Sequence, residues 1–532
     1  MLRLVSFAAL LISAIAAGAQ PNAVPLYTDL GSHHKAISSR LPTAQQYFDQ
    51  GLRLAYGFNH GEAIRSFTRA AEIDPACVMC WWGIAYAFGP HVNAPMDSAS
   101  GVSAHAAAQK ALVLSAAAAP WEKAYATAIA ARYSPVPPPD RSALDSAYAR
   151  EMRRITVQYP DDLDAAALYA ESLMDLRPWN YWTPKGEPYA GTLEMVSHLE
   201  RAIARNPNHP GACHYYIHAV EAVSPKLAVP CAERLAGLMP GVGHMVHMPA
   251  HIYIRVGRWS DAVQANHHAI HSDEVFIDGQ RPEGLYPLAY YPHNFHFLAF
   301  ASTMAGLSAQ AIEASRTLVS KVNVDAARQF ESLQEYLPYH ALTLTTFGKW
   351  DEIIALQLPP ADTRFAYGIG HYARGVAHAA KGNWADAELA LDTVKAITDA
   401  TPATSDSKTA LSIAVHALTG EIAERRGQVA SAVAHYRMAL ELEDAALYIE
   451  PPKWHHPMRH ALGAALLKSG KPAEAEAVYL EALRRLPENG WSLFGLAAAL
   501  KAQGKEAEAL DAHARFAAAW KNSDTKLMTA RF

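Results

Sequence analysis

Small residues return at fixed offsets along the helical, alanine-rich stretches of this chain. In residues 44–75 the small positions are Gly51, Ala63 and Ala70, an aromatic ring stands at Phe67, and a proline closes the stretch. Small side chains let two antiparallel helices approach closely, and proline cannot continue a helix. The stretch is therefore predicted to form one pair of antiparallel helices.

The same pattern returns in the second half of the chain at a recurring interval. The steps from Ile353 to Ala387 and from Ala475 to Ala509 are each 34 residues, which is the period of tetratricopeptide repeats. A longer step of 43 residues from Ala432 to Ala475 indicates loops inserted between some helices. We therefore predict an all-α fold: a solenoid (right-handed superhelix) of tetratricopeptide-type helix pairs with loop insertions.

Glycine stands in several of the turns that would join these helices. It readily takes the left-handed backbone conformation in which many helices end. We expect that conformation at Gly257, Gly348, Gly382, Gly470 and Gly504.

A chain of 532 residues is too long for one compact core and suits an extended repeat array. Differences in the regularity of the pattern divide it into segments. These are a signal peptide (1–19), an extended N-terminal segment (20–42), N-terminal tetratricopeptide-like helices (43–160), a central histidine-rich region (161–330), C-terminal repeats (331–520) and a tail (521–532).

The first residues have the features of a secretory signal peptide. Arg3 gives a positive start, residues 4–17 are apolar, and residues 17–19 form a small-residue cleavage site. The alternative is a buried N-terminal helix. No later stretch approaches the roughly 20 apolar residues of a membrane span. We expect a periplasmic or secreted protein without a membrane span.

Export implies an oxidising compartment in which disulfides form. The candidates are Cys77, Cys80, Cys213 and Cys231, and the sequence leaves their pairing open. Cys213 and Cys231 fall on the two predicted helices of one repeat and could bridge it. The pair at 77 and 80 lacks the following histidine of a haem site, because Trp81 stands there.

Histidine is the unusual residue of this chain, with 26 copies clustered in the middle. In a helix pair of this kind, roughly the second, fifth, ninth and twelfth positions of the first helix share the face toward the concave groove. Three successive first helices place histidines there. These are His214 and His218, then His244, His247 and His251, then His293 and His296.

Histidines four residues apart on one helix face can chelate a single ion. Neutral imidazole suits zinc, copper or iron. Glu171 and Glu221 are the candidate general bases, and Glu171 is also a possible carboxylate ligand. The seven histidines therefore predict a transition-metal site, and a metal-free polar groove is the alternative.

Other histidines are expected to be ordinary core or surface residues. They are His267, His268 and His271 on a second helix, and His455, His456 and His460. Arg255, Tyr291 and Asn294 are expected to contact a ligand in the groove. The net charge is only −5 and no basic face is visible, so we expect no nucleic acid partner.

The chain resembles a group of bacterial exported tetratricopeptide proteins that has no established reaction. The matching runs are residues 44–51, 57–63, 74–83, 247–253, 291–297 and 488–496. His91 stands where the group has asparagine. The repeat likeness implies that a peptide or protein binds in the groove, which is an analogy at the level of the fold.

Three functions remain open from the sequence. The first is an exported scaffold that binds a peptide, protein or small ligand in its concave groove and carries a histidine-rich metal site. The second is a metal-dependent hydrolase or oxidoreductase that uses the same histidines. The third is a protein-interaction module without metal.

Overall fold

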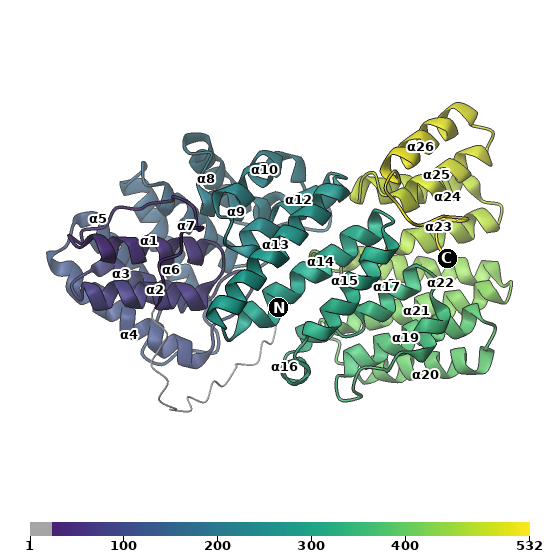
Figure 1. Ribbon diagram of the computed structural model, residues 1–532, viewed down its shortest axis with the longest axis horizontal. Coiled ribbons are helices and arrows are strands. Elements are labelled where there is room, and N and C mark those ends of the chain that lie inside the picture. The colour runs from purple at the N-terminus through teal and green to yellow at the C-terminus, as the bar shows by residue number, and fades with distance from the viewer. Residues whose placement is uncertain (1–23) are drawn as a thin grey trace. The chain divides into compact units, whose positions relative to one another are not determined.

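The computed structural model describes residues 24–532. The predicted signal peptide lies outside the described residues. In the described part, α-helices and short helical turns carry the fold, and β-structure is limited to two isolated bridges (Figure 1). None of the described helices is both long and apolar enough to cross a bilayer. The predicted all-α class with helix-pair organisation is confirmed.

The chain forms two compact units. The N-terminal unit comprises residues 24–252 and 268–287, and the C-terminal unit comprises 253–267 and 288–532. The three boundaries fall inside α12 (Pro249–Arg255), α13 (Trp259–Gln280) and the helical turn Tyr286–Tyr290.

The N-terminal unit contains the first run of helices. They are α1 (Pro42–Tyr56), α2 (His60–Ile73), α3 (Val78–Ala87), α4 (Ser98–Leu114), α5 (Pro120–Ala131), α6 (Ser142–Gln158), α7 (Leu163–Asp175), α8 (Thr192–Arg205), α9 (Pro210–Val220), α10 (Val229–Leu238) and α11 (Gly243–His247).

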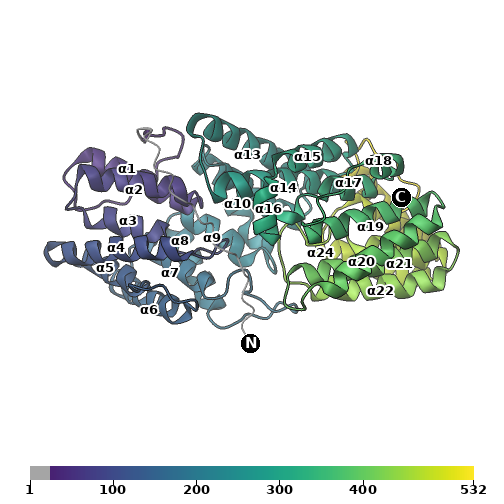
Figure 2. The ribbon, with the colours of Figure 1, turned by 90° about the horizontal axis from the view of Figure 1, so that it is seen from below.

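The C-terminal unit contains the second run, in which α19 packs on α20 and α21, and α21 on α22 (Figures 1 and 2). Its helices are α14 (Tyr291–Met304), α15 (Ser308–Lys321), α16 (Val324–Gln329), α17 (Tyr339–Thr346), α18 (Trp350–Ala355), α19 (Arg364–Ala380), α20 (Trp384–Ala400), α21 (Ser407–Arg425), α22 (Val429–Ala445), α23 (Met458–Lys468), α24 (Pro472–Arg485), α25 (Gly490–Lys501) and α26 (Glu506–Ala519).

Glycines and aromatic rings interlock between consecutive helices, as the repeat pattern predicts. A Cβ on Gly51 of α1 would lie 2.7 Å from the Phe67 ring, and one on Gly83 of α3 would lie 2.4 Å from the same ring. In the C-terminal unit, Gly463 and Gly495 take the same places around Tyr479, at 2.4 and 2.2 Å. The missing side chains make room for the ring, which is why the small positions recur.

The glycine turns also adopt the predicted conformation. Gly257, Gly348, Gly382, Gly470 and Gly504 all have φ between 67° and 81°. These left-handed residues end a first helix and let the chain reverse into the second.

Candidate metal centre

Five histidines of the N-terminal unit come from α9, α11 and α12, with α10 between the first two. His214 and His218 lie one turn apart on α9, and Glu221 directly follows that helix. His244 lies on α11, and His247 is the last residue of the same helix. His251 lies on α12. The repeated spacing of three or four residues places these rings on one face of each helix.

All of these side chains are removed from solvent. The exposed fraction is 0% for His214, His247 and Glu221, 2% for His251, and 3% for His218 and His244. Polar groups buried so completely need partners, because an unpaired one costs about 1–3 kcal/mol. Their orientation therefore reflects the partners that each ring nitrogen finds.

The inner nitrogens of the rings face one another. Nε2 of His214 lies 3.1 Å from Nε2 of His244, and Nε2 of His247 lies 2.9 Å from Nε2 of His251. Two nitrogens that share a tetrahedral zinc at 2.0–2.1 Å would lie roughly 3.3 Å apart. Ligand atoms of His214, His218 and His244 all lie within 4.8 Å of one another, as do those of His218, Glu221 and His251.

The outer nitrogens of three rings face oxygen acceptors. Nδ1 of His214 donates to the carbonyl oxygen of Tyr56 at 2.6 Å. Nδ1 of His218 and Nδ1 of His251 donate to the two carboxylate oxygens of Glu221, at 3.1 and 2.7 Å. Since these oxygens can only accept, the proton of each neutral ring stays on Nδ1 and leaves a lone pair on Nε2. Metal-binding histidines in proteins are commonly oriented in this way.

The electrostatics favour neutral rings at His214, His218 and His244 and an ionised carboxylate at Glu221. Burial lowers the pKa of His218, and burial with neighbouring imidazoles holds the pKa of His214 and His244 well below the ordinary value. Burial alone would raise the pKa of Glu221, but the charge of His251 and hydrogen bonds from His218 and His251 lower it to about 2. Neutral imidazole is the form that binds metal.

Phe58 covers this group of rings and was missed by the sequence reasoning. Its ring centroid lies 4.5 Å from that of His214, 5.3 Å from that of His244 and 4.9 Å from that of His91. Phe58 has φ 56° in the turn between α1 and α2, a conformation that costs a bulky residue free energy and often occurs at functional sites. The only local sign of this position in the sequence is Gly57, which directly precedes Phe58 and indicates a turn.

Glu171 lies in a different buried cluster. It stands on α7 and is fully buried, and burial raises its pKa to about 7 despite the positive charge of Arg132. In the same cluster Arg132 pairs with Asp175 at 2.5 Å. Among the described residues, none of the groups with metal-ligand spacing includes Glu171. Of the two candidate carboxylates, the structure brings only Glu221 to the imidazoles.

The other predicted site residues belong to the C-terminal unit. His293 and His296 have ring centroids 6.3 Å apart, and the His296 ring lies 4.2 Å from that of Tyr339. Burial lowers the pKa of His296 to about 3.

The predicted groove residues also belong to the C-terminal unit. Arg255 lies over the Tyr448 ring, and Tyr291 lies under Lys321. Asn294 is 1% exposed. Arg255 and Tyr291 therefore lie against other side chains of their own unit, and Asn294 is buried.

The cysteines form one disulfide, between Cys77 and Cys80 at the start of α3. Cys213 and Cys231 are buried thiols, so the bridge that their positions allowed is not formed in the structure. The two thiols nevertheless interact, as their placement on α9 and α10 suggested.

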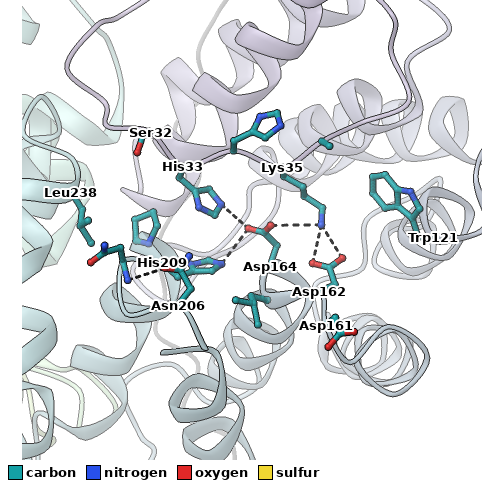
Figure 3. Close-up of a pocket in the computed structure, with 15 residues that line it drawn as sticks. Ser32, His33, Lys35, Trp121, Asp161, Asp162, Asp164, Asn206, His209 and Leu238 are labelled. Carbon is teal, nitrogen blue, oxygen red and sulfur yellow. Dashed lines mark hydrogen bonds and ion pairs between the residues drawn. The ribbon is translucent and has the colours of Figure 1, made fainter. Parts of the chain in front are cut away.

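A polar pocket of about 680 Å³ lies elsewhere in the N-terminal unit, where α7 and α9 begin (Figure 3). Asp164 accepts from His33 Nε2 at 2.8 Å and from the Tyr56 hydroxyl at 2.6 Å. Lys35 pairs with Asp162 at 2.8 Å. Burial would raise the pKa of Asp164, but the charges of Lys35 and His33 hold it well below its ordinary value.

The spacing of His33, Asp164 and His209 would also suit a metal. The position of the proton on the His209 ring is unfavourable for metal binding. His209 Nδ1 accepts from the backbone N–H of Ala212 at 3.1 Å, so Nε2 carries a proton, and it lies 3.4 Å from an Asp164 oxygen. A protonated nitrogen cannot bind an ion. His33 therefore donates to the Asp164 carboxylate, Nε2 of His209 faces the same oxygen, and Tyr56 links this network to His214.

Comparisons with known proteins leave the function open. No protein-family model matches the chain, and no curated protein matches it. Among solved structures, the human IFIT1 dimer with m7Gppp-AAAA shares 13% identity at a TM-score of 0.34, covering 90% of each chain. The structure of Naa15/Naa10 bound to HypK-THB shares 13% identity at a TM-score of 0.24, covering 90% of this chain and 70% of the other. The chain is a tetratricopeptide-like helical repeat protein on the evidence of its own helix pairs.

Proposed function

We propose that this chain is an exported tetratricopeptide-type scaffold that binds a transition-metal ion in its N-terminal unit. His214, His218 and His244 are the proposed primary ligands, with His247 and His251 beside them. The observation that carries the proposal is the orientation of His214, His218 and His251, whose Nδ1 atoms each donate to an oxygen acceptor. This arrangement leaves the lone pair of each of these rings on Nε2, and ligand atoms of His214, His218 and His244 lie within 4.8 Å of one another, close enough to share an ion.

The donor set favours a borderline metal. Neutral imidazole nitrogens suit zinc, copper and iron, whereas calcium and magnesium prefer oxygen. The carboxylate of Glu221 lies outside the nitrogens and supplies a negative charge that offsets part of the charge of a divalent ion. Zinc or copper fits such a nitrogen-rich site best, and iron is the third candidate.

A binding role fits this site better than a catalytic one. An enzyme that activates water needs an open coordination position and a base within reach of it. The candidate ligands are at most 3% exposed, and both oxygens of Glu221 accept from histidines. With a pKa of about 2, Glu221 is a poor general base at neutral pH. The second candidate function, a metal-dependent enzyme, therefore has the weaker support.

The partner of the scaffold is proposed to be a peptide or protein, as its repeat architecture and its likeness to bacterial exported proteins suggest. Periplasmic or secreted localisation is part of the proposal. The expectation that nucleic acid is not a partner rests on the net charge of −5 and stays a prediction.

Elemental analysis of the purified mature protein tests the metal site. We expect a stoichiometric transition metal that is lost in a His214→Ala, His218→Ala double variant and in a His247→Ala, His251→Ala double variant. His268→Ala, on an exposed histidine of α13, should leave the metal content unchanged. Absence of metal after loading with zinc and copper salts would leave a metal-free interaction module.

A further inference from the structure

The segment 521–532, which follows α26, lies against the C-terminal unit without forming a helix (Figure 1). It makes two sets of polar contacts, one near each of its ends. The residues between them include both buried and exposed side chains. Leu527 is 7% exposed and Ala530 is 3% exposed, while Met528 between them is 79% exposed. An extended chain bound through separate anchors shows this pattern.

The first anchor caps a neighbouring helix. Asp524 accepts hydrogen bonds from the backbone N–H groups of Ser308 and Ala309, at 2.6 and 2.9 Å. These are the first residues of α15, whose own preceding residue supplies no capping side chain. Thr525 adds a hydrogen bond from its hydroxyl to the carbonyl oxygen of Gly306 at 2.7 Å.

The second anchor is an arginine between two carboxylates. Arg531 pairs with Glu421 at 2.6 Å and with Glu424 at 2.8 Å. Its guanidinium lies 5.4 Å from the Tyr436 ring centroid, a distance at which cation–π attraction operates. Phe532 follows, with its ring 6.0 Å from that of Trp491.

These carboxylates occupy ligand-facing positions of the repeat. Gly420 packs on the Tyr436 ring and marks the eighth, small position of its helix pair. Glu421 and Glu424 are then the ninth and twelfth positions of the first helix, which share the face toward the concave surface. The segment therefore covers the surface that such repeats offer to extended peptides.

We propose that this surface is a peptide-binding site for a partner segment that carries an arginine followed by an aromatic residue, and that 521–532 is its displaceable resident occupant. The acidic pair and Tyr436 select the arginine, and Trp491 receives the aromatic ring. The anchors are few and the segment has no helical hydrogen bonds of its own, so it can detach by local opening while the helices stay folded. This inference rests on the proposed role as a peptide-binding scaffold and is independent of the proposed metal site.

The test compares the intact chain with a shortened chain that ends at residue 520. Both are titrated with a fluorescent synthetic peptide that has the sequence of residues 521–532. We expect the shortened chain to bind the peptide at least tenfold more tightly than the intact chain does. A peptide with Arg531→Glu should bind at least tenfold more weakly, and one with Met528→Ala, which changes an exposed side chain, should bind like the original. An intact chain carrying Arg531→Glu should bind the original peptide better than the unmodified chain does.

Failure of a folded shortened chain to bind the peptide would overturn the proposal, as would equal binding of the Arg531→Glu peptide. If the shortened chain loses its helical circular dichroism, hydrogen exchange on the intact chain decides. Amides of 521–532 that exchange well before those of α21 support a displaceable occupant. If the amides of 521–532 and of α21 exchange at the same rate, the segment is an integral part of the unit and the proposal is refuted.

Discussion

Nδ1 of His251 lies 2.7 Å from Oε2 of Glu221. The same carboxylate accepts from His218 through its other oxygen, so one side chain fixes the protons of two rings. Each ring is thereby held in the tautomer that presents Nε2 to an ion. We therefore expect Glu221 to raise metal affinity by orienting the histidines and not by binding the ion itself.

Glu221→Gln tests this role. An amide has one accepting oxygen and one donating nitrogen, so it cannot accept from both histidines. We expect metal affinity to fall about 10–100-fold, the usual effect of losing such an orienting partner, with little change in helical content. Chelator competition measures the affinity. Glu72→Gln on the exposed face of α2 is the matched control, and equal affinities in both variants would contradict the assignment.

The metal-free protein should lose stability on acidification below about pH 6.5, the pKa of histidine in an unfolded chain. Burial lowers the pKa of His455 and His460 to about 3, and burial with the charge of Arg132 lowers that of His60 to about 4. Between these values and 6.5 the unfolded chain binds protons that the folded chain does not. Each pH unit then costs up to about 1.4 kcal/mol per histidine. Urea unfolding with a chelator at pH 7.5, 6.0 and 5.0 checks the slope, and a flat profile would show that these rings are hydrated.

Gly51→Leu should destabilise the N-terminal unit by about 1–3 kcal/mol through overpacking. Even a Cβ there would lie 2.7 Å from the Phe67 ring. Gly237→Ala is the control, because a Cβ at that helical position meets no atom within 4 Å and alanine favours helix. The shift of the urea midpoint measures both. Similar midpoints for the two variants would count against the packing of the repeat.

Thiol counting tests the cysteine assignment. In denaturant without reductant we expect two reactive thiols per chain, from Cys213 and Cys231, and four after reduction, because Cys77 and Cys80 are joined. In the folded protein both thiols should react slowly, since both are buried. Four reactive thiols before reduction, or none, would require a different pairing.

The helix pairs were predictable because their signals are local. Close approach of two neighbouring helices needs small residues at fixed offsets, and these can be read directly along the chain, as at Gly51 and Ala475. The turn glycines are equally local, because a left-handed residue is needed wherever a first helix reverses into the second. The spacing of His214 and His218 likewise predicted that the two rings share a helix face.

The partners of those rings were decided only by tertiary packing. The acceptor for His214 is the carbonyl of Tyr56, 158 residues away, and no periodicity connects such distant positions. The same applies to Phe58, and to the placement of Glu171 beside Arg132. Helical periodicity fixes the direction of a side chain from its own helix. Which nitrogens can share an ion depends on how separate helices pack, and that follows from the whole arrangement of the unit.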